Sequence, residues 1–250
     1  ILTRFLDSRD FSGNPGISWR DRITGTCVRN ELERPQSRDL DIYPSPYLEG
    51  LFEDIIAENK DLEFQQIIET NRGCPFLCTF CSWGQGGLSR KYRYHSVEWV
   101  ASEIEWAARH KIRYLYNADS NFGMHKRDVE IAQILVDVKK QFGYPDKFRT
   151  TYGKNTDERI FQVAKLLHDH DLGRGVTLAR QSNDDGVLLN IKRDNIKMST
   201  YKNLQTRFNE IDVPVYTELI LGLPGETEET WAAGIEQILQ SGLKNQLIIP

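Results

Sequence analysis

The chain has 250 residues, of which 39% are hydrophobic and 27% are charged, and its formal net charge is −4. Such a composition is typical of a globular protein, and this length is enough to bury a sizeable core. The small negative charge gives no bulk attraction to nucleic acid or to an anionic membrane. No run approaches the roughly 18 apolar residues of a membrane span, and residues 1–10 are too polar for a signal peptide. We therefore expect a cytoplasmic protein that binds neither membranes nor nucleic acid.

Residues 1–60 show no regular pattern and contain turn signals at Asn14-Pro15-Gly16 and at Pro44-Ser45-Pro46. We predict a linker here, with a few short strands and one short helix near Leu48–Glu58. The chain begins at Ile1 without a methionine and ends at Pro250 just after an apolar run. We expect it to be a piece of a longer protein.

From residue 61 to residue 250, short strand-like runs alternate with amphipathic helical runs, and we expect one domain there. The strands are predicted at Phe64–Thr70, Arg113–Asn117, Phe148–Tyr152, Gly175–Ala179 and Val215–Leu221, and a sixth begins at Gln246. The helices are predicted at 97–108, 131–138, 160–167, 184–191, 199–211 and 228–241, with Ser96 and Thr227 as N-caps and Gly242 as the stop. Five strand–helix units favour a parallel sheet covered by helices. A doubly wound sheet and a barrel both fit this pattern.

Three of the four cysteines, Cys74, Cys78 and Cys81, stand in one short segment. Their spacing lets three thiolates converge from one loop, and thiolates select zinc or iron–sulfur clusters. Structural zinc and ferredoxin clusters use four ligands, and no fourth stands nearby. Three ligands on a four-iron cluster leave one iron open to a substrate or cofactor. Cys27 lies in a strand-like stretch, where we expect a small buried hydrophobic residue.

The pattern Cys-x3-Cys-x2-Cys, with Phe80 before the last cysteine, resembles the signature of the radical S-adenosylmethionine (SAM) superfamily. The resemblance implies that Cys74, Cys78 and Cys81 bind a catalytic 4Fe–4S cluster whose open iron is chelated by the amino and carboxylate groups of SAM. Reductive cleavage of the sulfonium then gives a 5′-deoxyadenosyl radical. It also implies a partial (β/α)6 barrel, truncated near the sixth strand, and an external electron donor such as flavodoxin or ferredoxin.

Polar residues after two of the predicted strands occupy places where this family binds SAM. Asp119 and Asn121 follow the second strand in Asp119-Ser120-Asn121-Phe122, where the usual Gly-Gly-Glu is absent. The resemblance assigns this loop to the methionine amino group, and the alternative is that Asp119 caps a turn. Gln181 and Ser182 follow the fourth strand and are assigned to the ribose hydroxyls and the carboxylate, or to a helix-capping turn.

The segment after the next short helix and the end of the fifth strand complete the expected cofactor site. Arg193 is assigned to the SAM carboxylate, unless it is a solvated surface arginine. Gly222 lets the backbone approach adenine, on which Leu223 and Phe80 would pack. The alternative for Phe80 is packing within the cluster loop. Glu218 alternates toward the barrel interior and would touch cofactor or substrate, or pair with a basic residue such as Arg180.

Two stretches before the cysteines resemble the linker between a cobalamin-binding domain and a radical SAM domain: Asn14–Arg20 and Asp39–Pro46. Together with Gly-Leu-Pro-Gly-Glu-Thr at 222–227, they place the chain near the cobalamin-dependent branch, with the cobalamin bound by a domain outside this chain. The resemblance then implies methylation or another C–H functionalisation of a small molecule, peptide or natural product. A methylthiotransferase-like enzyme and a non-catalytic iron–sulfur or zinc module are the alternatives.

Overall fold

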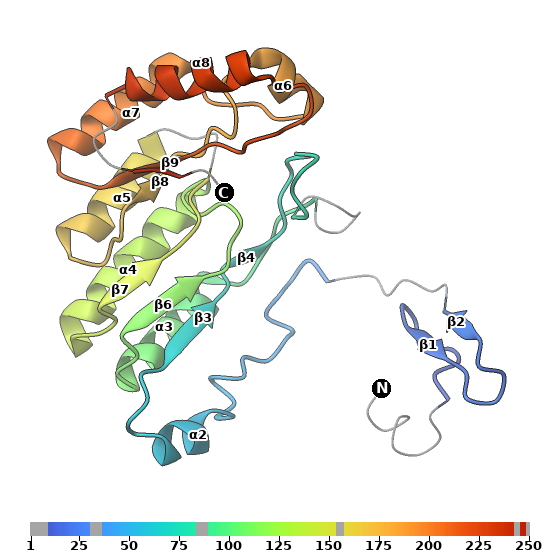
Figure 1. Cartoon of the computed structure of the whole chain (residues 1–250). Coiled ribbons are helices and arrows are strands. Elements are labelled where there is room, and N and C mark those ends of the chain that lie inside the picture. Colours follow the sequence, from blue (N-terminus) through green and yellow to red (C-terminus); the bar gives the residue numbers. More distant parts are fainter. Residues whose placement is uncertain (1–9, 31–36, 84–89, 154–157, 243–245, 249–250) are drawn as a thin grey trace. The chain divides into compact units, whose positions relative to one another are not determined.

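The computed structural model describes residues 10–30, 37–83, 90–153, 158–242 and 246–248 (Figure 1). The chain divides into two compact units, Ile1–Arg38 and Asp39–Pro250. In the described part of the first unit, β1 (Ser18–Arg20) pairs antiparallel with β2 (Cys27–Arg29). Cys27 is exposed on this hairpin. The expectation that Cys27 is a buried hydrophobic residue is therefore wrong, because a two-stranded hairpin has too little surface to bury it.

The strands of the second unit form two parallel three-stranded sheets. In the first, β6 (Tyr114–Asn117) lies between β3 (Gln65–Ile68) and β7 (Lys147–Arg149). In the second, β9 (Val215–Glu218) lies between β8 (Val176–Thr177) and β10 (Gln246–Ile248). In both sheets the spatial order follows the chain order, without the reversal that marks a doubly wound fold. This order favours a barrel. Among the described residues the barrel is partial, because β7 and β8, at the edges of the two sheets, do not pair with each other.

Two short strands stand apart from these sheets. β4 (Asn71–Arg72) directly precedes the cysteine loop and pairs antiparallel with β5 (Arg93–Tyr94). The chain therefore leaves β3, runs through the cysteine loop and returns beside its own starting point.

Helices connect the parallel strands, and Figure 1 shows them along one side of the sheets. They are α3 (Val97–Arg109), α4 (Lys126–Phe142), α5 (Glu158–Asp169), α6 (Asp185–Asn190), α7 (Met198–Glu210) and α8 (Glu228–Leu239). The predicted N-caps are confirmed, since Ser96 accepts from the Trp99 amide and Thr227 from the Thr230 amide. α8 ends at Leu239, earlier than Gly242, which adopts a positive φ in the turn that follows. None of the described helices is both long and apolar enough to cross a membrane.

Alternation along the strands gives the sheets two different faces. The face toward the helices is apolar and buried, with Leu115 at 1% exposure and Val215 at 0%. The other face carries larger and more polar side chains, such as Tyr116 at 38% and the half-buried Tyr216. This second face is open to solvent, as the interior of a partial barrel would be.

Residues 39–64, which precede β3, belong to the second unit. They include the helix α2 (Glu53–Glu58), close to the predicted place. Leu40 is fully buried, and the Ser45 hydroxyl donates to the Glu103 carboxyl at 2.5 Å. The compact unit therefore starts at Asp39, earlier than the boundary predicted at residue 60, because short irregular segments can still bury side chains.

Candidate active site

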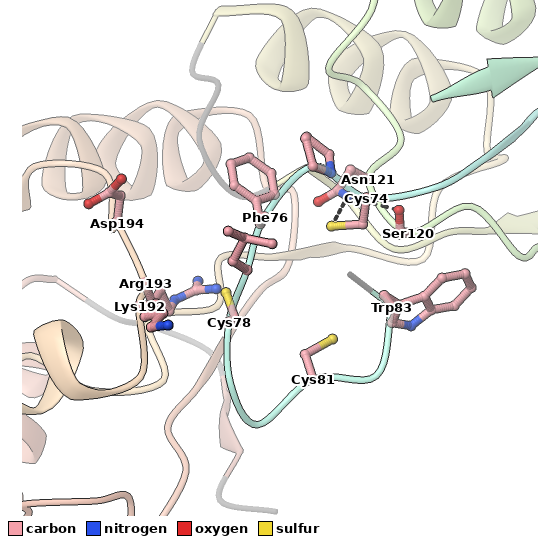
Figure 2. A pocket seen from close by; sticks show the side chains of 12 residues that line it. Cys74, Phe76, Cys78, Cys81, Trp83, Ser120, Asn121, Lys192, Arg193 and Asp194 are labelled. Carbon is pink, nitrogen blue, oxygen red and sulfur yellow. Dashed lines mark hydrogen bonds between the residues drawn. The ribbon is translucent and has the colours of Figure 1, made fainter. Parts of the chain in front are cut away.

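The three cysteines of the loop line one cavity of about 300 Å³ (Figure 2). Cys74 and Cys78 are buried and Cys81 is half-buried. The Cys81 amide donates to the Cys78 carbonyl at 3.1 Å, which closes the turn between the last two thiols. The Thr79 amide donates to the Ile191 carbonyl at 3.0 Å and ties the loop to the end of α6.

Asp119, at the end of β6, fixes the start of this loop. Its carboxylate accepts hydrogen bonds from the Thr70 amide at 2.7 Å, from the Asn71 amide at 3.1 Å and from the Asn71 side chain at 2.8 Å, and the Thr70 hydroxyl donates to it as well. Burial raises the pKa of Asp119, although these donors favour its charged form. Asp119 is 1% exposed and is not among the residues that line the cavity. The structure therefore gives it a role in holding β3 and β6 together.

The next two polar residues of the same loop do reach the cavity. The Asn121 side-chain amide donates to the Cys74 sulfur at 3.3 Å and to the Ser120 hydroxyl at 2.9 Å. The Ser120 hydroxyl in turn donates to the Gly73 carbonyl at 2.8 Å. Since the amide nitrogen of Asn121 is occupied in this way, its orientation is fixed and its carbonyl oxygen is left as an acceptor.

Arg193 enters the cavity from the loop after α6 and lies beside the Cys78 thiol (Figure 2). It is 5% exposed and donates to the Ala179 carbonyl at 2.6 Å and to the Asn195 side chain at 2.8 Å. Burial lowers the pKa of this guanidinium, and the nearby Cys78 sulfur opposes that shift. Arg193 is thus a buried cation aimed at the thiols, which excludes the alternative of a solvated surface arginine.

The donor set fits an iron–sulfur cluster. Three thiols surround one cavity, and an amide N–H and a guanidinium, groups that stabilise thiolates and cluster sulfurs, lie against two of them. Among the described residues, no three His, Cys, Asp or Glu side chains are grouped closely enough for a single metal ion. The cysteines therefore surround a space and do not converge on one point.

Residues 68–238 match the model of the radical SAM superfamily. The chain belongs to this superfamily. Its members use a 4Fe–4S cluster and SAM, and the Cys-x3-Cys-x2-Cys loop lies within the matched residues of this radical SAM chain.

Two methyltransferases are similar to this chain over nearly its whole length. The chain is 40% identical over 245 residues to the cobalamin-dependent radical SAM methyltransferase TokK of Streptomyces tokunonensis, a match that covers 97% of this chain and 35% of that protein. It is 38% identical over 244 residues to the 2-(S-pantetheinyl)-carbapenam-3-carboxylate methyltransferase of Streptantibioticus cattleyicolor, with the same coverage of 97% and 35%. The chain thus spans about a third of the length of these two relatives.

A solved structure confirms the predicted fold. The radical SAM methyltransferase TsrM from Kitasatospora setae, determined with cobalamin and a [4Fe-4S] cluster bound, superposes with a TM-score of 0.71 at 17% identity. The superposition covers 99% of this chain and 48% of TsrM. The partial barrel expected for this radical SAM chain is therefore the observed architecture.

Several residues that the sequence assigned to SAM lie outside the cysteine cavity. Leu223 is 6% exposed and packs in a small apolar cluster with residues of α6. Phe80 is 38% exposed and is not among the residues that line the cavity. Gly222 adopts a φ of +80°, and its amide donates to the Glu226 side chain at 2.6 Å. The Gly-Leu-Pro-Gly loop of this radical SAM chain therefore packs on α6.

Gln181 and Ser182 are both buried and link the ends of β8 and β9. The Gln181 backbone, at a φ of +65°, pairs with Leu219, and the Ser182 hydroxyl accepts from the Asp184 amide at 3.2 Å. The predicted alternative of a capping turn before α6 is thus present. Glu218 lines a different cavity, and Arg180, its expected partner, donates instead to Asn183 and to the Ile196 carbonyl.

Besides Trp83, six of the cavity residues were not assigned to the site from the sequence: Pro75, Phe76, Leu77, Ser120, Lys192 and Asp194. Ser120 stands between two assigned residues, and Lys192 and Asp194 flank Arg193, so a contiguous-loop argument would have found them. Trp83 also lines the cavity and is 49% exposed.

Proposed function

We propose that this chain is the radical-generating part of a cobalamin-dependent methyltransferase that acts on an unactivated carbon. The observation that carries the proposal is the cavity in which three cysteines, Asn121 and Arg193 meet. The similarity over 97% of the chain to two methyltransferases, one of them described as cobalamin-dependent, supports the methylation outcome. The cobalamin itself would be bound by a part of the protein outside this chain.

Different residues of the cavity would bind the cluster and SAM. Cys74, Cys78 and Cys81 hold the cluster, which when bound supplies the electron for reductive cleavage of the SAM sulfonium. We assign Arg193 to the SAM carboxylate, because a guanidinium offers two parallel donors to such a group. We assign the carbonyl oxygen of Asn121 to the methionine ammonium, in place of Asp119, whose oxygens already accept from Thr70 and Asn71.

Two residues at the cavity edge would control access. Trp83 and Leu77 are half-exposed apolar side chains that line the same cavity as the thiols. Together they place apolar surface between the cluster and solvent, which limits water and oxygen at the iron. An external electron donor such as flavodoxin or ferredoxin would approach this side.

The test uses the protein in its full natural length, purified and reconstituted without oxygen. With a chemical reductant and SAM it should release 5′-deoxyadenosine, and Cys78→Ala should abolish this release, because two ligands do not retain an open-site cluster. The measurement is chromatographic quantification of 5′-deoxyadenosine together with iron and sulfide content.

Cys27→Ala is the matched control, since it also removes one thiol but from an exposed position on the β1–β2 hairpin. It should keep both the iron content and the release of 5′-deoxyadenosine. Persistent cleavage in Cys78→Ala, or zinc in place of iron in the wild type, would refute the cluster assignment.

A further inference from the structure

A second cavity, of about 370 Å³, lies on the open face of the sheets where β7 meets β8 and β9. Its polar lining comes from all three strands and the residues next to them: Arg149, Thr150, Arg174, Thr177, Tyr216 and Glu218. None of these side chains lines the cysteine cavity. The proposed holding of cluster and SAM therefore leaves this cavity without a role.

Two arginines of this cavity have no carboxylate partner within the described residues. The guanidinium of Arg149 lies 5.9 Å from the Tyr116 ring centroid, and that of Arg174 lies 5.6 Å from the Tyr114 centroid. Neighbouring basic residues differ, because Lys147 pairs with Asp171 and Arg113 pairs with both Glu63 and Asp146.

Arg149 and Arg174 are exposed, and each guanidinium group lies over a tyrosine ring that attracts it without using its hydrogen-bond donors. A cation over an aromatic face is held by the ring quadrupole, while the N–H groups at its edge stay available. Arg149 and Arg174 therefore keep guanidinium N–H groups available as hydrogen-bond donors at the rim of one cavity.

Gly175 keeps this cavity wide enough for a ligand group. It adopts a φ of +99°, and a Cβ atom added there would lie 2.5 Å from Cε2 of Tyr216 and 2.8 Å from the Pro214 carbonyl oxygen. The Tyr216 ring therefore lies against the bare backbone of β8 and does not fill the space between the strands. Hydroxyl groups of Thr150 and Thr177 line the same space and add neutral donors.

We propose that this cavity is an anion subsite, in which Arg149 and Arg174 bind a carboxylate or phosphate group of an organic molecule bound in the barrel. Planar guanidinium groups match the two oxygens of such a group. Only the identity of the bound molecule rests on the proposed function, since either an acidic substrate or the phosphodiester of cobalamin offers this chemistry. Glu218 is the one carboxylate in the lining and weakens anion binding, so that a poorly fitting anion is rejected.

The probe is inorganic phosphate, titrated calorimetrically into the full-length protein without SAM. Arg149→Gln and Arg174→Gln should each weaken phosphate binding about tenfold or more, because each removes a charge-assisted donor. Arg149→Lys should retain part of the affinity for phosphate, since it keeps the positive charge but loses the paired N–H donors of the guanidinium. Glu218→Gln should shift the affinity in the opposite direction and tighten binding.

Lys165→Gln is the matched control, because it also removes one positive charge but at an α5 residue paired with Asp169. It should leave the phosphate affinity unchanged. The proposal is overturned if Arg149→Gln and Arg174→Gln bind phosphate like the wild type, or if Lys165→Gln loses as much affinity as they do. Iron and sulfide content of the same samples reports on the cluster, so failure of the proposed function is recognised separately.

A second titration identifies the source of the anion. Saturating hydroxocobalamin should abolish phosphate binding if the cobalamin phosphodiester fills the subsite, whereas cobinamide, which lacks that group, should not. If an acidic substrate fills it, phosphate should bind with undiminished affinity in the presence of hydroxocobalamin. Both results support an anion subsite, and absence of phosphate binding with and without hydroxocobalamin contradicts it.

Discussion

Glu103 on α3 is a carboxyl group almost wholly removed from water. It is 2% exposed, and its described hydrogen-bond partner is the Ser45 hydroxyl at 2.5 Å. Burial raises its pKa to about 7, and the negative charge of Glu69 adds to the shift. One neutral donor does not compensate for the loss of hydration of a carboxylate, so the protonated form is favoured.

This shift predicts a stability that falls as the pH rises. A carboxyl whose folded pKa is raised from 4.5 to about 7 stabilises the fold fully below pH 4.5 and loses that contribution as the pH rises through 7. The loss amounts to at most about 3 kcal/mol. Glu103→Gln keeps the partner of Ser45 without the charge. Urea unfolding at pH 5 and pH 8 should therefore show a smaller pH dependence for Glu103→Gln than for the wild type.

Glu105→Gln, two residues further on the same helix, is the control for this experiment. Glu105 is half-exposed and pairs with Arg109, so its replacement should leave the difference between pH 5 and pH 8 as in the wild type. Equal pH dependence in Glu103→Gln and the wild type would mean that Glu103 is already ionised in the folded protein.

For single residues, the sequence correctly indicated those whose position follows from their spacing along the chain. The three cysteines lie in one short loop, so their convergence needs only local geometry, and Arg193 and Asn121 stand next to it at strand and helix ends. For Leu223 the direction of the side chain depends on which helix packs after the strand. Here α6 buries Leu223, and no periodicity in the sequence carries that information.

Among the elements, β6 and β3 are joined beyond their ladder by the carboxylate of Asp119. The ladder pairs Gln65–Ile68 with Tyr114–Asn117, and Asp119 continues the connection through four donors of Thr70 and Asn71. The cysteine loop begins only two residues later, so the position of Cys74 depends on this connection.

Asp119→Asn tests that dependence. The amide keeps one acceptor oxygen but turns an NH₂ group toward the donors of Thr70 and Asn71, which leaves buried donors unpaired. We expect a loss of about 2–3 kcal/mol in the free energy of unfolding and a lower yield of reconstituted cluster. Urea titration and iron content per chain measure the two effects.

Asp137→Asn provides the comparison for a change of the same chemistry. Asp137 is exposed on α4 and accepts only from Gln133 among the described contacts, so both readouts should match the wild type. Asp119→Asn with wild-type iron content would show that the strand connection does not position Cys74.

Sequence reasoning placed these elements well wherever apolar periodicity was strong. The helices α3, α4, α5 and α7 were found because each buries one stripe of residues. The strand expected at Gly175–Ala179 is only Val176–Thr177, because Gly175 is at positive φ and the chain bends toward Gln181. Such bends depend on contacts between strands, here with Pro214 and Tyr216.

On the scale of the molecule, the two faces of the sheets divide stability from chemistry. The helix side holds one continuous apolar core that includes Ile68, Leu115, Phe148, Val176 and Val215. The open side holds the tyrosines and arginines of the proposed anion subsite. The alternation of residues along the strands could predict an apolar face and a polar face. A doubly wound sheet would have given the same alternation, so the strand order was needed to distinguish a barrel from a doubly wound sheet.

The extent of the core unit is itself open to experiment, because residues 39–60 read as a linker in the sequence. Leu40→Ala and Leu48→Ala remove the same atoms from the same segment, but Leu40 is fully buried and Leu48 is 44% exposed. If the segment belongs to the core, Leu40→Ala should cost about 2–5 kcal/mol in the free energy of unfolding, and Leu48→Ala well under 1 kcal/mol. A true linker would give two small and equal losses.

Amide hydrogen exchange in β3 and α3 reports on this unit alone, even in a longer protein with several domains. If the segment belongs to the core unit, Leu40→Ala should accelerate the exchange of the most protected amides of both elements together, because loss of the fully buried Leu40 side chain lowers the stability of the whole unit. The amides next to Asp41 should follow, since Asp41 accepts from the Ser96 amide at 3.1 Å and contacts His95 at 3.0 Å. If only amides near residue 40 exchange faster, the segment unfolds locally without the core, and the core unit begins later in the chain.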